Sequence, residues 1–260
     1  MKKFNLIGLD TQDSLSPHIH NFVFNQMGIK ATYSSINIDS SANIEKITSK
    51  IKSGLIEGLN VTNPYKVNVI KYLDALDLPA KKIGAVNCLS LKSGKIWGHN
   101  TDWLGFKRMI MDYKINFNNK KIKIIGNGGA ALAVKYAFQD MGISKIEFYN
   151  RKKIGYNLLD FKNSLDNESF VINATPYHFV ENDLFIFNKI QTENLIWIDL
   201  LYTKLSTEKN KKIDKNRYFN GLDMLIYQAL ASIDIWFRKN ISNSVDLIDL
   251  KLYLKEVIDA

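Results

Sequence analysis

The fold is decided by the stretch Lys121-Ile122-Lys123-Ile124-Ile125-Gly126-Asn127-Gly128-Gly129-Ala130-Ala131. Its first five residues have the pattern of a short β-strand, glycines follow directly, and residues 132–141 continue as a helix. A strand, a glycine-rich turn and a helix in this order aim helix N-terminal amides at a phosphate, and glycine lets the backbone approach it closely. The stretch therefore predicts a Rossmann-like nucleotide-binding domain in which Gly126, Asn127, Gly128, Gly129 and Ala130 contact the cofactor.

The next expected strand, residues 145–149, ends in Asn150-Arg151-Lys152. In NAD-selective folds this place usually holds an acid, whose carboxylate accepts hydrogen bonds from the ribose hydroxyls. Arginine can instead clasp a 2′-phosphate with two parallel donors and stack on the adenine. We therefore expect NADP rather than NAD, bound by Asn150, Arg151 and Lys152. The alternative is a solvated basic turn in a lysine-rich chain.

The rest of the chain predicts a second α/β domain. Residues 1–101 alternate short apolar runs with amphipathic stretches and end in an expected hairpin around Gly94, whose freedom of φ suits a tight turn. A helix over 102–115 connects two halves, and two amphipathic helices, 224–237 and 245–258, are expected to return to the first domain. Residues 152–170 leave room for one short helix, so we expect an abbreviated crossover in the nucleotide-binding sheet.

Composition excludes several classes of protein. The 260 residues carry a net charge of +9, but the basic residues are 31 Lys and 4 Arg, dispersed among acidic ones, which disfavours nucleic-acid binding. No apolar stretch approaches the roughly 20 residues of a membrane span. The single Cys88 cannot form an intramolecular disulfide, and four scattered histidines do not compose a zinc site. We expect a cytoplasmic, metal-free protein.

Several segments of the chain together match the motifs of one known family. They are collinear and span nearly the whole chain, and the most specific are Asn-Val-Thr-Asn-Pro-Tyr-Lys at 60–66 and Asn-Thr-Asp at 100–102. The others are Ser-Leu-Ser-Pro-His-Ile-His-Asn at 14–21, Gly-Ala-Val-Asn at 84–87, Asn-Ala-Thr-Pro at 173–176, and Gly-Leu-Asp-Met-Leu-Ile-Tyr-Gln at 221–228.

Together these segments resemble the shikimate dehydrogenase family. The resemblance implies NADPH-dependent reduction of 3-dehydroshikimate to shikimate, on the route to chorismate and the aromatic amino acids. It implies two α/β domains with a cleft between them: residues 1–101 and 222–260 as the substrate domain, and 102–221 as the Rossmann-like NADP-binding domain. We expect small-molecule partners and a monomer or homodimer. A quinate/shikimate dehydrogenase using NAD and a non-catalytic nucleotide-binding relative remain as alternatives.

The resemblance also assigns the chemistry to Lys66 and Asp102. Negative charge develops on the carbonyl oxygen as hydride reaches its carbon, and a nearby ammonium can stabilise that charge and donate a proton. Lys66 is thus the expected acid–base residue and Asp102 its partner, although Asp102 could also be the N-cap of the connecting helix.

The remaining residues implied by the resemblance would hold the ligands. Ser14 and Ser16, assisted by Tyr202, would bind the substrate carboxylate, although simple helix capping by Ser16 is an alternative. The neutral partners of the ring hydroxyls would be Thr62, Asn87, Thr101 and Gln228, and further cofactor contacts would come from Thr175 and Gly221.

Overall fold

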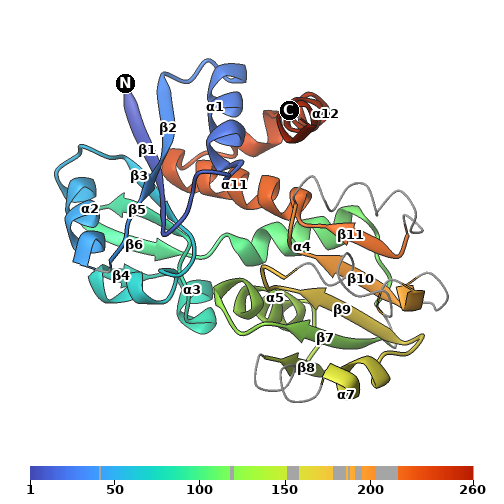
Figure 1. Cartoon of the computed structure of the whole chain (residues 1–260). Coiled ribbons are helices and arrows are strands. Elements are labelled where there is room, and N and C mark those ends of the chain that lie inside the picture. The colour runs from blue at the N-terminus through green and yellow to red at the C-terminus, as the bar shows by residue number, and fades with distance from the viewer. Residues whose placement is uncertain are drawn as a thin grey trace. The chain divides into compact units, whose positions relative to one another are not determined.

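The computed structural model describes residues 1–40, 42–117, 120–150, 158–177, 186, 188–190, 195–202 and 216–259. The chain divides into two compact units (Figure 1). Unit 1 comprises Met1–Gly105 and Leu225–Ala260, and unit 2 comprises Phe106–Met224. The architecture is α/β in both, with a mixed sheet in the first unit and a parallel sheet in the second.

The unit boundaries lie inside two helices, a few residues from the expected boundaries at 101/102 and 221/222. These helices are α4, Asp102–Asp112, and α11, Leu222–Phe237. The start of α4 is bonded within unit 1, whereas the ring of Phe106, one turn later, packs against Phe138 of unit 2. The residue pattern of the sequence predicts a domain boundary where a helix begins. The packing instead places the boundary inside the helix, where its side chains stop contacting one unit and begin to contact the other.

The sheet of unit 1 has six strands in the order β2-β1-β3-β5-β6-β4. Strand β1 pairs in parallel with β2 and β3, whereas β3–β5 and β5–β6 are antiparallel and β4–β6 is parallel. The strands are β1 Lys2–Gly8, β2 Ala31–Asn37, β3 Gly58–Val61, β4 Ala75–Leu76, β5 Cys88–Lys92 and β6 Lys95–His99. Besides parts of α4 and α11, the helical elements are α1 Ser16–Gln26, α2 Ala42–Lys52, η1 Asn68–Tyr72, α3 Leu78–Ile83, η2 Ile241–Ser244 and α12 Leu247–Asp259.

The expected hairpin around Gly94 is confirmed by the pairing of β5 with β6. Its two turn residues, Ser93 and Gly94, have φ of 52° and 73°. Two positive φ values in succession match the right-handed twist of the flanking strands. The sequence predicted a positive φ for Gly94 alone and not for Ser93.

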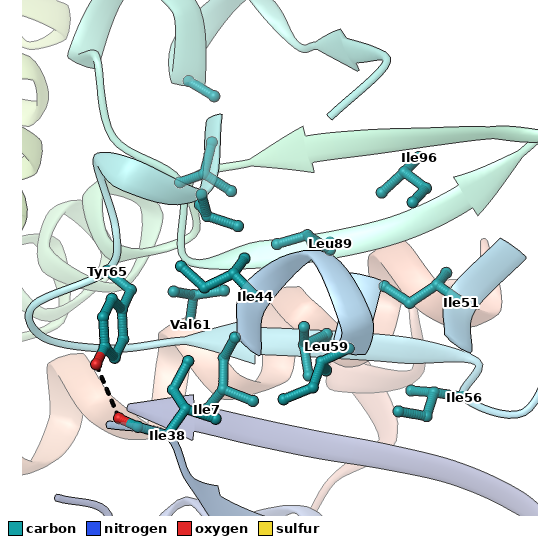
Figure 2. Packing of buried hydrophobic residues seen from close by; sticks show 14 residues of the cluster. Ile7, Ile38, Ile44, Ile51, Ile56, Leu59, Val61, Tyr65, Leu89 and Ile96 are labelled. Carbon is teal, nitrogen blue, oxygen red and sulfur yellow. Dashed lines mark hydrogen bonds between the residues drawn. The ribbon is translucent and has the colours of Figure 1, made fainter. Parts of the chain in front are cut away.

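Helix α2 covers one face of the unit 1 sheet (Figure 2). Ile44 and Ile51 of this helix lie over Ile7, Leu59 and Leu89 of the central strands, and all five are fully buried. Every residue of β3 is buried, as expected for a strand covered on both faces. On the other face, Trp236 of α11 donates a hydrogen bond to the carbonyl oxygen of Leu89 at 2.9 Å.

In the described part of unit 2, the sheet has five parallel strands in the order β11-β10-β9-β7-β8. They are β7 Lys121–Ile125, β8 Ile146–Tyr149, β9 Ser169–Asn173, β10 Ile196–Asp199 and β11 Tyr218–Asn220; its helices include α5 Gly129–Asp140 and α7 Leu158–Asn163. The chain leaves β7 for β8 on one side and returns to β9 on the other. Ligands of such sheets bind at this reversal, outside the carboxyl ends of the strands.

The predicted strand, glycine turn and helix are confirmed as β7, residues 126–128 and α5. The helix begins at Gly129, earlier than the expected 132, because Gly128 is extended and serves as the N-cap. Among the described residues between β8 and β9, α7 is a helix of six residues, as expected for a short crossover. No described helix combines the length and apolar character that crossing a bilayer requires.

Candidate active site

Lys66 and Asp102 form a short ion pair in unit 1, with 2.7 Å between lysine Nζ and aspartate Oδ2. Their side chains are 13% and 7% exposed, so the pair is largely shielded from solvent. Lys66 follows β3 and Asp102 opens α4, so residues 36 positions apart in sequence meet here. An ammonium held by a buried carboxylate can donate a proton in a fixed direction.

The N-terminus of α4 is capped by Asn100, not by Asp102. The Asn100 Oδ1 accepts hydrogen bonds from the backbone N–H of Asp102 at 3.1 Å and of Trp103 at 3.4 Å. The capping alternative for Asp102 is therefore wrong, and its carboxylate is available to Lys66. Asparagine just before a helix is a recognised capping signal, so Asn100 could have been found from the sequence.

Asn87 holds the second oxygen of Asp102. Its Nδ2 donates to Asp102 Oδ1 at 2.8 Å, while its Oδ1 accepts the backbone N–H of Thr101 at 2.6 Å. Each carboxylate oxygen of Asp102 thus receives one strong donor from the protein and keeps acceptor capacity for another. A hydroxyl of a ligand next to the pair could donate to it.

A buried polar layer supports Asn87 from α11. The amide oxygen of Gln228 lies 3.3 Å from Asn87 Nδ2 and 3.4 Å from the Thr101 hydroxyl. Behind it, the Ser232 hydroxyl accepts from Asn60 Nδ2 at 3.0 Å and contacts Thr101 at 3.2 Å. Neither Asn60 nor Ser232 was singled out for a role from sequence, because nothing in a single chain distinguishes a supporting amide or hydroxyl from other buried ones.

Thr62 and the two serines complete the predicted substrate residues of unit 1. Thr62 is half-buried and its N–H donates to the carbonyl of Ile7 at 2.8 Å, which fixes it beside β1. The Ser14 hydroxyl accepts the N–H of Ser16 at 3.2 Å. The N-cap of α1 is Leu15, so simple capping by Ser16 is wrong.

The structure brings together Lys66, Asn87, Thr101, Asp102 and Gln228 through the contacts above. Tyr202, the predicted assistant of the serines, belongs to unit 2, follows β10 and is half-buried, and its role at a carboxylate stays a prediction.

The glycine turn of unit 2 leaves open space that a phosphate could use. Gly126 has a φ of 118°, which residues with a Cβ rarely adopt, and a Cβ there would lie 3.1 Å from the carbonyl oxygen of Ala174. Gly128 has nothing within 4 Å of its Cβ position, and Gly129 begins α5. This open, amide-lined turn at a helix N-terminus fits the phosphates of a dinucleotide.

The segment after β9 lies beside this turn. The N–H of Ala174 donates to the carbonyl of Ile125 at 2.9 Å, and Thr175 is held by its N–H and hydroxyl, both donating to Asn173 Oδ1 at 3.0 and 2.7 Å. Gly221 has its N–H bonded to the Leu201 carbonyl, and a Cβ there would collide with the backbone of Leu200.

The predicted cofactor residues at the end of β8 are described only in part. Asn150 follows the strand and is half-buried. Arg151 and Lys152 lie outside the described residues.

We expect Gly126→Ala to raise the KM for NADP⁺, the cofactor expected from the sequence, at least tenfold while leaving the KM for the other substrate nearly unchanged. The added Cβ forces either the glycine turn or the carbonyl group of Ala174 to move. A residue with a Cβ is also strained at the φ of 118° that position 126 adopts. Gly142→Ala is the matched control, since Gly142 also has a positive φ, of 86°, but has open space around it. Steady-state kinetics and thermal melts of both variants make the comparison. Equal effects of the two substitutions on the KM for NADP⁺ would contradict a cofactor role for Gly126.

Comparisons with known proteins show which family the chain is similar to. Residues 6–89 match the shikimate dehydrogenase substrate binding domain family. The chain is 34% identical to shikimate dehydrogenase (NADP⁺) of Saccharolobus solfataricus, covering 99% of this chain and 96% of that protein. Shikimate dehydrogenase 1 of Peptoclostridium difficile has a similar structure, with a TM-score of 0.78, 30% identity and coverage of 99% and 98%.

A second solved structure is informative about ligands. It is shikimate 5-dehydrogenase of Listeria monocytogenes in complex with shikimate and NAD, with a TM-score of 0.77, 26% identity and coverage of 98% and 96%. The fold of these relatives comprises a substrate-binding and a Rossmann-like domain, as expected from the sequence. Identity above 30% over nearly the full length of both proteins is decisive: the chain belongs to the shikimate dehydrogenase family.

Proposed function

We propose that the protein is an NADP-dependent shikimate dehydrogenase that interconverts 3-dehydroshikimate and shikimate on the route to chorismate and the aromatic amino acids. The observation that carries the proposal is the 2.7 Å pair of Lys66 and Asp102 within a layer of neutral hydrogen-bonding groups. In the same proposal, unit 1 binds the substrate and unit 2 binds the cofactor.

In the direction of reduction, NADPH supplies the hydride that adds to the carbonyl carbon. Lys66 stabilises the negative charge that develops on the carbonyl oxygen and donates a proton to it, which gives the hydroxyl of shikimate. Asp102 fixes the ammonium and accepts from a neighbouring ring hydroxyl. In the direction of oxidation, Lys66 takes the proton back.

Neutral groups set the specificity for a polyhydroxylated ring. Thr62, Asn87, Thr101 and Gln228 would exchange hydrogen bonds with the ring hydroxyls, and an analogue lacking one of them would leave a polar group of the site unpaired. Ser14 and Ser16, with Tyr202, would hold the carboxylate.

The cofactor would be held by the glycine turn at 126–130, by Thr175 and Gly221, and by Asn150, Arg151 and Lys152. Arg151, which comes two residues after β8 in the sequence, is the residue that favours NADP, because an arginine has two parallel donors that match the 2′-phosphate. We further propose that the enzyme acts in the cytoplasm as a monomer or homodimer, which light scattering of the purified protein distinguishes.

The decisive experiment follows the absorbance of reduced nicotinamide with shikimate or quinate and with NADP⁺ or NAD⁺. We expect kcat/KM for shikimate to be at least about tenfold higher with NADP⁺ than with NAD⁺, since the phosphate adds charge-assisted hydrogen bonds. Equal use of NAD⁺, or equal turnover of quinate, would favour a quinate/shikimate dehydrogenase. Binding of NADPH without any turnover would favour a non-catalytic relative.

A further inference from the structure

His20 is fully buried on α1, four residues after Ser16. Its Nδ1 lies 2.8 Å from the backbone carbonyl oxygen of Ser16. Because a carbonyl can only accept, Nδ1 carries the proton, and the lone pair of the neutral ring is on Nε2. Among the described residues, no group hydrogen-bonds this Nε2. Burial lowers the pKa of His20 to about 4, so the ring is neutral around pH 7.

A buried imidazole at position 20 stabilises the fold less than an apolar ring of similar size would. A buried nitrogen without a partner loses its bond to water and gains nothing in return, whereas a phenyl ring of similar shape has no such atom. The one interaction that phenylalanine could not reproduce is the hydrogen bond from Nδ1 to Ser16. That bond is the physical reason for histidine at position 20.

The plane of the His20 ring is fixed by its neighbours. It stacks on Tyr33 with ring centroids 3.9 Å apart and planes within 8°. The adjacent Asn21 clamps the backbone of Tyr33 by accepting its N–H and donating to its carbonyl, at 2.9 and 2.8 Å. The Tyr33 hydroxyl donates to Asn60, which in turn donates to the carbonyl of Asn87. The Nδ1 donor is therefore aimed at Ser16 by a rigid frame that also contacts the polar layer of the site.

We propose that His20 is a positioning residue for substrate binding: it holds the Ser16 backbone, and with it the Ser14 and Ser16 hydroxyls, in place for the substrate carboxylate. The inference rests on the proposed function, because it takes the two serines as the carboxylate site. The Ser14 hydroxyl is itself bonded to the Ser16 N–H, so movement of the Ser16 backbone disturbs both hydroxyls.

The test is His20→Phe, which keeps a stacking ring and removes the donor. We expect the KM for shikimate to rise about tenfold, the equivalent of about one lost hydrogen bond, while kcat and the KM for NADP⁺ change less than twofold. The melting temperature should be unchanged or higher, with the larger gain at pH 5. There the unfolded histidine, with a pKa of 6.5, binds a proton that the native ring, with a pKa of about 4, does not, so the stability that histidine costs grows as the pH falls from 6.5 to 4.

Three comparisons separate positioning from a general structural role. His20→Gln keeps an N–H donor and should retain a KM closer to that of the unmodified enzyme. Phe24→Leu alters a fully buried neighbour on the same helix and should lower stability while leaving the KM for shikimate unchanged. With the methyl ester of shikimate as ligand, the His20→Phe penalty in KM or in inhibition constant should disappear, because the carboxylate charge is masked.

The proposal is overturned if folded His20→Phe has an unchanged KM for shikimate. It is also overturned if the KM for shikimate and the KM for NADP⁺ rise together. Two further results would overturn it: a rise in the KM for shikimate in Phe24→Leu as large as that in His20→Phe, or a His20→Phe effect that persists with the methyl ester of shikimate. His20→Leu removes the same donor with a smaller side chain and replaces the phenylalanine variant if that does not fold. Failure of the proposed function would show earlier, as absence of shikimate oxidation by the unmodified protein.

Discussion

Lys66→Ala is expected to lower kcat for shikimate oxidation by about three orders of magnitude while changing the KM for shikimate less than about tenfold. Proton transfer by a positioned side chain contributes typically 10²–10⁴-fold, and stabilisation of the developing charge adds to it. Alanine removes both effects. The neutral groups that would hold the ring hydroxyls, Thr62, Asn87 and Gln228, remain, so binding survives better than turnover.

The matched control is Lys52→Ala. Lys52 also pairs with an aspartate of unit 1, Asp74, at 3.0 Å, but its side chain is 50% exposed. An exposed pair contributes little to stability, so this variant should keep nearly normal kinetics and a nearly normal melting temperature. Near-normal turnover of Lys66→Ala, or an equal loss in both variants, would contradict the assignment of Lys66 as the acid–base residue.

The features that the sequence predicted are those with a local physical cause. A strand pattern followed by glycines and then by a helix pattern is compatible with few local structures. This is why β7, the turn at 126–128 and α5 were predictable. The hairpin at Gly94 is of the same kind. The resemblance motifs added pairs distant in sequence, such as Lys66 and Asp102, that no periodicity could have brought together.

The features that could not be predicted depend on competition between neighbours. Asn100 and Asp102 are both good capping residues, and only the fold shows that Asn100 caps α4 while the carboxylate of Asp102 turns to Lys66. A similar competition puts Leu15 at the N-cap of α1 although serines flank it. His20 is part of a matched motif, yet its orphaned nitrogen is visible only once the ring is packed against Tyr33.

Asp102→Asn is expected to lower kcat/KM for shikimate by about 10²–10³, and the hydrogen-bond inventory of the site explains why this conservative change is severe. Asp102 accepts Lys66 Nζ on one oxygen at 2.7 Å and Asn87 Nδ2 on the other at 2.8 Å. Asparagine has one acceptor oxygen and one donor nitrogen, so it can satisfy only one of these two donors. The other donor then faces an NH₂ group, and the ammonium of Lys66 loses its counter-charge.

Two measurements separate this cause from general instability. The free energy of unfolding should fall by about 1–3 kcal/mol, the cost of one buried donor left without an acceptor, so the variant should still fold and its kinetics can be measured. Asp112→Asn is the control on the same helix, because Asp112 pairs with Arg108 at 3.0 Å and is about one-third exposed; it should change neither kcat/KM nor stability appreciably. If folded Asp102→Asn kept more than about a tenth of normal kcat/KM, then Lys66 would not depend on this carboxylate, and the catalytic pair would reduce to the lysine alone.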